Sequence, residues 1–244
     1  KERLERELEV ARDIQLSILP RELPLDPGWE FGVHFSSMEA VGGDFYDVMN
    51  LGKGKLGVAV GDVSGHGVPA ALFMSLTATL LRVEAMRSES PREVLQTVNR
   101  QLLATSDSGL FVTVLYGILD RNTRSFQYVR AGHPTPLLAN PGMQAVQLEA
   151  ELGQFLGFHD ELTLDEVDLS LPPESTMLIY TDGITEAVDA NGDFFGDDGL
   201  LAALGTGDSR QPDQICREIW EALRIFQGTV PRDDDITLLA VRAK

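Results

Sequence analysis

The sequence predicts an α+β fold with stacked antiparallel sheets, and three observations favour it. Short alternating or continuously apolar segments recur between turn residues along most of the chain, as strands do. Segments in which apolar residues return every three or four positions, as on helices, are grouped between those strands. The two kinds of segment do not alternate regularly, so a parallel sheet built from βαβ units is not expected.

The individual elements follow from these patterns and from the turn residues that separate them. Strands are expected at residues 29–37, 56–63, 111–120, 125–131, 136–139, 166–171, 176–181 and 236–242. Helices are expected at residues 67–88, 91–105, 197–204 and 212–227. The turn Arg121-Asn122-Thr123-Arg124 separates two of the strands and predicts a β-hairpin.

The N-terminal segment predicts a linker helix. Residues 1–18 are rich in Glu, Arg, Leu and Ala and contain no Gly or Pro. A narrow seam with 4-3-4-3 spacing runs along this segment, formed by Leu4, Leu8, Ala11, Gln15 and Ile18. Prolines then break the helix, so we expect a helix within residues 1–20 and a globular domain over residues 21–244. The seam either pairs with the same segment of a second chain, giving a homodimer, or packs against its own domain.

Charge and composition exclude several classes of function. The net charge of −18 argues against nucleic acid and against an anionic membrane surface, because both would repel the chain. No apolar run is expected to reach the roughly 20 residues of a membrane span, so we expect no membrane insertion. The first residues are charged where a signal peptide would be apolar, and the chain begins with Lys, which suggests that it starts inside a longer protein. The single cysteine, Cys216, is typical of a reducing cytoplasm, where we expect the protein to reside.

Four acidic motifs occur at expected strand ends or turns. They are VGGDFYD at 41–47, GDVSGHG at 61–67, YTDG at 180–183 and DDDIT at 233–237. An Asp-Gly pair is most often an ordinary turn. Asp62 and Asp182, however, directly follow apolar strands, and carboxylate oxygens in such places are the ligands that hard divalent cations prefer. The acidic motifs therefore predict a metal site.

Taken in order, these motifs, together with AGHP at 131–134 and the leading ARDIQLSILP, resemble the protein phosphatase 2C superfamily. The resemblance is closest to the bacterial branch that contains the sporulation stage II E and RsbU-type regulators, and it covers nearly the whole chain. One local departure is Ser37-Met38, where relatives usually read Pro-Ala. The resemblance implies a four-layer α-β-β-α sandwich with two stacked antiparallel sheets, preceded by the linker helix.

The resemblance also implies a set of metal ligands. Asp62 would bridge two divalent cations, Mn²⁺ or Mg²⁺, and the backbone carbonyl of Val63 would add a ligand to the second. Asp182 and Asp234 would complete the first metal site. Asp44 would hold the second metal, either directly or through water.

The implied chemistry is hydrolysis of a phosphoester without a covalent enzyme intermediate. Two cations lower the pKa of a shared water, which attacks phosphorus in line, so Asp62 and Asp182 would act through a metal-bound water. Asp235 would support the metal ligands without binding a cation itself. His66, at an expected helix start, is close enough in sequence to protonate a leaving group, or is simply structural. His133 is expected to cap a turn.

Other phosphatase and signalling motifs fit poorly. The pattern Asp233-x-Asp235-x-Thr237 matches phosphatases that form an aspartyl-phosphate, but here it precedes the last strand rather than ending the first. Gly42-Gly43-Asp44-Phe45 lacks the glutamate of the cyclase GGDEF loop. Position 222, six residues after Cys216, is Ala rather than the arginine of the Cys-x5-Arg loop that cysteine phosphatases need.

The expected function is that of a metal-dependent protein serine/threonine phosphatase. The family resemblance implies a phosphorylated partner of the anti-anti-sigma (STAS) type and a sensor domain upstream of the linker helix. The alternative is a degenerate phosphatase fold that acts as a binding or adaptor module, which would be free to lose its carboxylates. Activity on small phosphorylated metabolites is a third interpretation.

Overall fold

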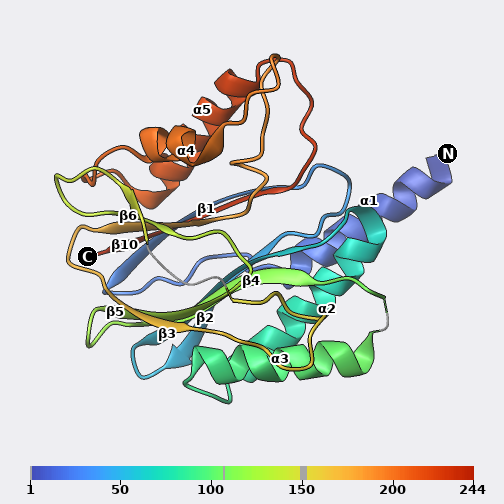
Figure 1. Cartoon of the computed structure of the whole chain (residues 1–244), viewed down its shortest axis with the longest axis horizontal. Helices are drawn as coiled ribbons and strands as arrows, with labels where there is room; N and C mark the ends of the chain where they lie inside the picture. Colours follow the sequence, from blue (N-terminus) through green and yellow to red (C-terminus); the bar gives the residue numbers. More distant parts are fainter. Residues whose placement is uncertain (1, 107, 149–152) are drawn as a thin grey trace.

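Two five-stranded antiparallel sheets lie face to face in the computed structural model, which describes residues 2–106, 108–148 and 153–244 (Figure 1). The first sheet has the order β1-β10-β9-β6-β7, with bounds Trp29–Ser36, Ile236–Ala243, Thr176–Tyr180, Leu137–Ala139 and Val146–Gln147. The second has the order β2-β3-β4-β5-β8, with bounds Phe45–Gly52, Lys55–Val63, Val112–Asp120, Ser125–Ala131 and Glu166–Ser170.

Helices cover the outer face of each sheet and complete the predicted four-layer sandwich. The helices α4 (Gly196–Leu204) and α5 (Pro212–Gln227) lie over the first sheet, where α5 contacts β1 and β10. The helices α2 (Gly67–Ala85) and α3 (Pro91–Thr105) lie over the second sheet. Apolar side chains fill the space between the two sheets and beneath each helical layer. The α+β prediction is therefore confirmed.

Most predicted elements form within one or two residues of their expected ends, including the β4–β5 hairpin. Two strands were missed. One is β2, which follows the VGGD motif directly and is buried on both faces over Phe45–Met49, so no alternation marks it. The other is β7, which has only two residues. The predicted helix 67–88 ends earlier, at Ala85, because the amides of Arg87 and Ser88 both turn back to the Glu84 carbonyl.

Helix α2 corrects one expectation about membranes. By length and apolar composition alone its 19 residues could cross a bilayer, although no such run was expected. Half of that apolar window is buried within the domain, where α2 packs on α3 and on strands β2 and β3. A helix that packs on a sheet, on α3 and on α1 at the same time needs apolar residues on several of its faces.

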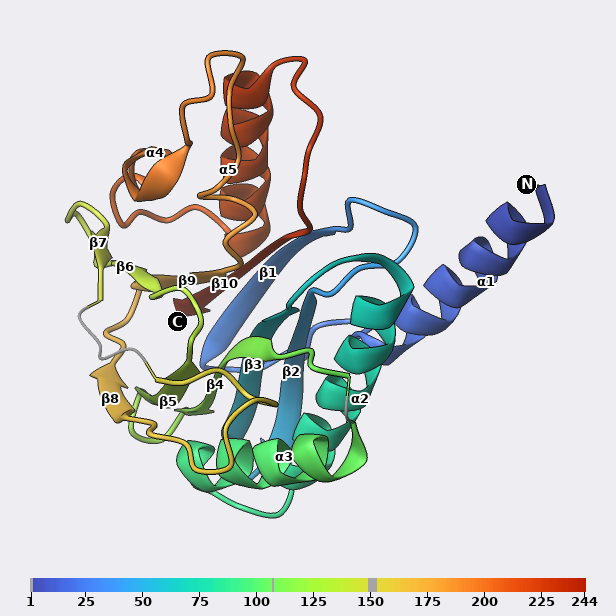
Figure 2. The ribbon, with the colours of Figure 1, turned by 45° about the vertical axis from the view of Figure 1, so that its right-hand side comes forward.

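The N-terminal helix α1 (Glu2–Ile18) docks at its C-terminal end and projects from the layers at its N-terminal end (Figure 2). In the predicted seam, Gln15 is buried and Ala11 and Ile18 are half-buried, so this part of the seam faces its own domain. The side chain of Leu4 lies outside the described part. Val10 and Ile14 are instead exposed. The C-terminal part of the seam therefore packs against the chain's own domain. The projecting N-terminal half of α1 is left available for other contacts.

Candidate metal centre

The four acidic motifs meet at one edge of the sandwich, although they come from both sheets. Asp44 directly precedes β2 and Asp62 lies near the end of β3, and these two strands are paired. Asp182 follows β9 and Asp234 precedes β10, and these strands are paired in the other sheet. The turns and strand ends of two stacked sheets therefore bring the predicted ligands together.

Asp44 connects the two sheets directly. Its carboxylate is 1% exposed, and Oδ2 accepts hydrogen bonds from the hydroxyls of Thr181 (2.8 Å) and Thr237 (2.6 Å). Thr237 lies on β10 and Thr181 directly follows β9. All hydrogen bonds that the described residues make to this carboxylate go to Oδ2, which leaves Oδ1 available to a cation or its water.

Asp235 holds the loop that carries Asp44. Its buried carboxylate accepts the backbone amide hydrogens of Met38 and Gly43, each at 2.7 Å, and more distantly that of Asp44. Both oxygens are thus occupied by backbone donors. Asp235, which directly precedes β10, thus holds the loop between β1 and β2 in place. This contact is consistent with the predicted supporting role.

The glycines beside the aspartates provide space for loops to approach one another. A Cβ on Gly42 would overlap the Asp235 carboxylate, and one on Gly183 would overlap the Asp235 carbonyl. A Cβ on Gly43 would lie 2.8 Å from the Val63 carbonyl oxygen. None of these three glycines has a positive φ, so what they supply is room rather than an unusual backbone conformation.

The enclosed carboxylates repel one another electrostatically. Burial, followed by the neighbouring charges of Asp44 and Asp182, raises the pKa of Asp62 to about 10. Burial also raises the pKa of Asp44 well above its ordinary range, although the Thr237 hydrogen bond opposes that shift. Burial likewise raises the pKa of Asp182, and it raises that of Asp234 to about 6. Without a cation, therefore, the cluster retains protons at neutral pH.

The chemistry of these donors fits hard divalent cations. The cluster offers carboxylate oxygens and the Val63 carbonyl, and it lacks a nearby basic partner that would neutralise Asp62. Within the described ranges, no three Asp, Glu, His or Cys side chains yet converge tightly enough to enclose an ion.

The comparisons with known proteins agree with this geometry. Residues 52–244 match the family model described as stage II sporulation protein E (SpoIIE). The chain belongs to this family. This match confirms the family resemblance seen in the sequence motifs, and the relatives include a phosphoserine phosphatase and solved 2C-type phosphatase domains.

Curated relatives of this SpoIIE-family domain are larger proteins. Protein IcfG of Synechocystis is 29% identical, with 96% of this chain and 41% of IcfG covered. Phosphoserine phosphatase RsbU of Bacillus subtilis is 26% identical, with 98% of this chain and 70% of RsbU covered. The chain thus spans less than half of IcfG.

Solved structures share the fold. The SiaA-PP2C domain of Pseudomonas aeruginosa superposes with a TM-score of 0.84 at 23% identity, covering 99% of this chain and 97% of that domain. RsbX, whose structure was solved in complex with magnesium, superposes with a TM-score of 0.66 at 18% identity, covering 91% of this chain and 99% of RsbX.

The histidines of the SpoIIE-family domain lie in different environments. The side chain of His66 is 77% exposed, and its Nδ1 lies 3.1 Å from Glu39 Oε1. His133 is fully buried, and its Nδ1 lies 3.0 Å from the Thr113 hydroxyl, opposite Asp62 on the neighbouring strand. Burial, followed by the charge of Arg130, lowers the pKa of His133 to about 3, so it is neutral. It therefore packs within the core and does not simply cap an exposed turn.

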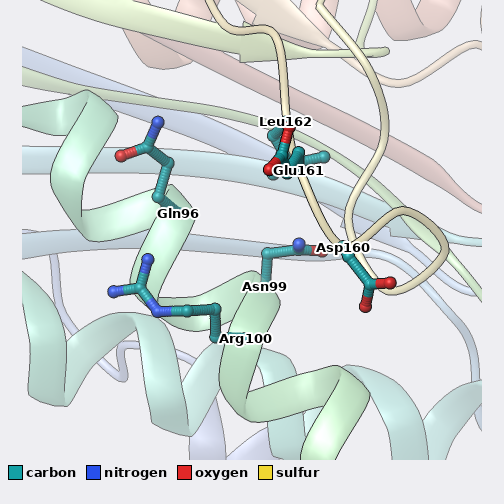
Figure 3. Close-up of a pocket in the computed structure, with 6 residues that line it drawn as sticks. All are labelled: Gln96, Asn99, Arg100, Asp160, Glu161 and Leu162. Atoms are coloured by element: carbon teal, nitrogen blue, oxygen red, sulfur yellow. The ribbon is translucent and has the colours of Figure 1, made fainter.

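One cavity lies apart from the acidic motifs. It has a volume of about 330 Å³, lies between α3 and the loop that precedes β8, and is lined by Gln96, Asn99, Arg100, Asp160, Glu161 and Leu162 (Figure 3). Asn99 is buried and holds this loop, because its side chain donates to the His159 carbonyl and accepts from the Gly157 amide. None of the four acidic motifs contributes to this cavity. The acidic centre is thus separate from this cavity.

Proposed function

We propose that this domain hydrolyses a phosphoserine or phosphothreonine on a regulatory protein partner, using two divalent cations held by its aspartates. The observation that carries the proposal is the enclosed carboxylate cluster around Asp62, whose pKa is raised to about 10 by burial and by like charges. Such a cluster is costly for a fold to keep unless a cation compensates it. An adaptor module would gain stability by losing these charges, which disfavours that alternative.

Asp62, Asp182 and Asp234 would hold one cation, and Asp62, Asp44 and the Val63 carbonyl would hold the other. When bound, Mn²⁺ or Mg²⁺ would supply a water activated at neutral pH and would neutralise the phosphoryl oxygens. The magnesium in RsbX supports this choice by analogy of fold. The aspartates are hard oxygen donors, so no softer metal is favoured.

The remaining residues of the centre would position these ligands. Thr181 and Thr237 donate hydrogen bonds to Oδ2 of Asp44, which leaves Oδ1 free to bind a cation. Asp235 fixes the backbone of the same loop. A phosphoamino acid on the surface of a folded protein is favoured over a small metabolite, because a small ligand usually needs an enclosing pocket and the cavity beside α3 lies apart from the acidic motifs.

The identity of the partner rests on relatives. RsbU is named a phosphoserine phosphatase, and the motifs resemble regulators that act on anti-anti-sigma (STAS-type) proteins. The position of α1 supports an upstream sensor domain, because its N-terminal half projects away from the layers. We further propose that the N-terminal half of α1 pairs with the same segment of a second chain to form a homodimer. The proposed location of the protein is the cytoplasm.

The test is hydrolysis of a generic phosphoester and of a phosphorylated STAS-type protein, each with Mn²⁺, with Mg²⁺ and with excess chelator. We expect turnover with either cation and none with chelator. Full turnover in chelator would exclude the two-cation mechanism. Tight binding of the phosphoprotein without turnover under any condition would instead support the adaptor alternative.

A further inference from the structure

A second cavity, at the end of α5, contains arginine and tryptophan side chains but no carboxylate. It has a volume of about 320 Å³ and extends onto the loop that leads from α5 to β10, which Figure 2 shows. It is lined by Trp220, Arg224, Gln227, Gly228, Val230 and Arg232. In a chain with a net charge of −18, such a cavity is a local exception, and its charge suits an anionic ligand.

Trp220 gives this arginine–tryptophan pocket a rigid aromatic surface. Its ring stacks on that of His34 from β1, with 4.4 Å between the ring centroids. The guanidinium carbon of Arg232 lies 5.5 Å from the Trp220 ring centroid, within the range of a cation–π contact. Burial, followed by the charge of Arg232, lowers the pKa of His34, so this histidine is neutral. The positive charge of the pocket therefore comes from its arginines.

Arg232 is fixed in place but keeps donors for a ligand. Its Nη1 donates to the carbonyl (3.3 Å) and the hydroxyl (2.8 Å) of Ser36, and its Nη2 donates to the Ser37 carbonyl at 3.3 Å. These bonds leave the Nε hydrogen and one Nη2 hydrogen without a partner in the described part of the chain. Asp233, the next residue, is exposed and does not line the pocket.

Arg224 supplies the second charge of the pocket. Its side chain is 59% exposed, and its Nη1 lies 3.3 Å from Oε1 of Glu221 on the preceding turn of α5. An exposed ion pair of this kind contributes little to stability. The guanidinium of Arg224 can therefore leave Glu221 for an anionic group that enters the pocket.

The pocket and the acidic centre share one loop. Arg232 binds the Ser37 carbonyl, and the next residue, Met38, donates its amide hydrogen to Asp235. Asp234, a predicted metal ligand, follows Arg232 by two residues. A protein interface of ordinary size covers about 800 Å² on each partner. A partner whose phosphorylated residue reaches the aspartates would therefore also cover this pocket.

We propose that the arginine–tryptophan pocket binds an acidic side chain near the phosphorylated residue of the partner, and so selects acidic partners. The inference rests on the proposed function, because it places the phosphorylated residue at the aspartates. A guanidinium binds a carboxylate through paired, charge-assisted hydrogen bonds. The expected preference is opposite to the one that net charge alone would produce, since a chain of −18 repels an acidic partner.

The first experiment compares two phosphoserine peptides at saturating free Mn²⁺. One carries glutamates on both sides of the phosphoserine, and the other carries glutamines at the same positions. We expect kcat/KM to be about fivefold or more higher for the glutamate peptide, with the difference in KM, because the contact forms before the chemical step and does not change during it.

Arg224→Glu should reverse this preference. The matched control is Arg92→Glu, which makes the same change of charge at an exposed arginine of α3, over the other sheet, and should keep the preference. Equal kcat/KM for the two peptides, or an unchanged preference in Arg224→Glu, would overturn the inference and leave the proposed function intact.

The second experiment measures binding without turnover or metal. The chain has two tryptophans, and Trp29 is 1% exposed at the end of β1 opposite to Ser36, so Trp220 reports on the pocket. The glutamate peptide with unmodified serine should change the tryptophan emission, whereas the glutamine peptide should not. Trp220→Phe should abolish the change.

The remaining outcomes separate the two proposals. An emission change with inorganic phosphate as large as that with the glutamate peptide would overturn the inference, because the pocket would then bind small anions in general. Binding of the glutamate peptide by a chain that hydrolyses no phosphoester would support the pocket's preference for acidic side chains and contradict the proposed function.

Discussion

The Asp44 carboxylate, immediately before β2, accepts a 2.6 Å hydrogen bond from the hydroxyl of Thr237 on β10 in the opposite sheet. This bond crosses the space between the two layers at the edge where the acidic motifs meet. It makes the position of a predicted metal ligand depend on how the two sheets are packed. A hydrogen bond to a buried charged group is also among the stronger ones in proteins.

Replacing Thr237 by Val should therefore weaken both the fold and the centre. We expect the free energy of unfolding to fall by about 1–3 kcal/mol and Mn²⁺ affinity to fall with it, because Asp44 loses one of its two donors. Thr237→Ser, which keeps the hydroxyl, should show much smaller effects. The matched control is Thr176→Val, since the Thr176 hydroxyl is buried and has no partner among the described residues. Urea unfolding with and without Mn²⁺ measures these changes, and equal behaviour of the two Val variants would contradict the assigned role.

Asp62→Asn and Asp182→Asn should each lower kcat by at least about 100-fold, because each removes a charged ligand of the cation that would supply the reactive water. Both variants should still fold, because the substitution relieves repulsion within the cluster. Steady-state kinetics with a generic phosphoester and saturating Mn²⁺ measure the loss. Near-normal turnover in both variants would mean that the site is placed wrongly. Asp168→Asn, on the outer strand β8, is a control that should retain full activity.

The metal-free protein should become less stable as the pH rises from 7 to 8.5. The pKa of Asp62 is about 10 in the folded state, so the folded chain binds a proton that the unfolded chain has released. Stability then falls with rising pH, by up to about 1.4 kcal/mol per pH unit for one such proton. The lowered pKa of His133 has the opposite effect, but only below its unfolded value of about 6.5, outside this window.

Urea unfolding in chelator at pH 7, 7.75 and 8.5 tests this slope. Mn²⁺ should flatten it by replacing the proton, and Asp62→Asn should flatten it without metal. A metal-free stability that rises with pH across this window would show that the cluster is not protonated as described.

His66→Ala should change kcat by less than about threefold, well below the 10²-fold or greater loss expected for a general acid. The reason is that His66 is exposed and lies beside Glu39 rather than among the aspartates. The pH dependence of kcat should keep its shape in the variant. A loss near 100-fold together with a missing acidic or basic limb would instead assign leaving-group protonation to His66.

Replacing the exposed Val10 and Ile14 of α1 by Glu should reduce self-association if the projecting half of the helix forms a dimer. Mass in solution by light scattering, measured together with turnover, reports the result. Arg12→Glu, also exposed on α1, is the control for added negative charge alone. Unchanged mass and turnover in the double variant would show that this half of α1 is neither a dimer seam nor a control element in this chain.

Periodicity and turn residues were sufficient to predict the α+β class and most elements, because apolar segments bounded by turn residues mark even strands buried on both faces, such as β9 and β10. The four-layer sandwich followed from the family resemblance. They failed at β2, which is buried on both sides and follows a motif whose glycines resemble a loop. They also failed at the internal contacts of α1. Gln15 occupied a position in an otherwise apolar seam, and a polar residue there was the available signal for a buried polar partner.

Strand pairing accounts for the approach of Asp44 to Asp62 in one sheet and of Asp182 to Asp234 in the other. Their role as metal ligands stays a prediction, because no three acidic side chains among the described residues converge tightly. The residues that hold them could not be foreseen. Thr181 and Thr237 are ordinary strand residues in sequence, and their role depends on the stacking of two sheets, which no local pattern encodes. Gly42 and Gly183 leave room for their loops to pack against Asp235, which the motifs alone do not indicate.

The enclosed aspartates also link metal supply to the amount of protein in a cell. A chain whose folded state is strained by its own charge is opened more often, and opened chains are what intracellular proteases degrade. A cation that binds only the folded form opposes that opening by mass action. If the domain is the proposed phosphatase, scarcity of manganese or magnesium would lower both its turnover and the amount of folded protein, and its phosphorylated partner would accumulate for both reasons.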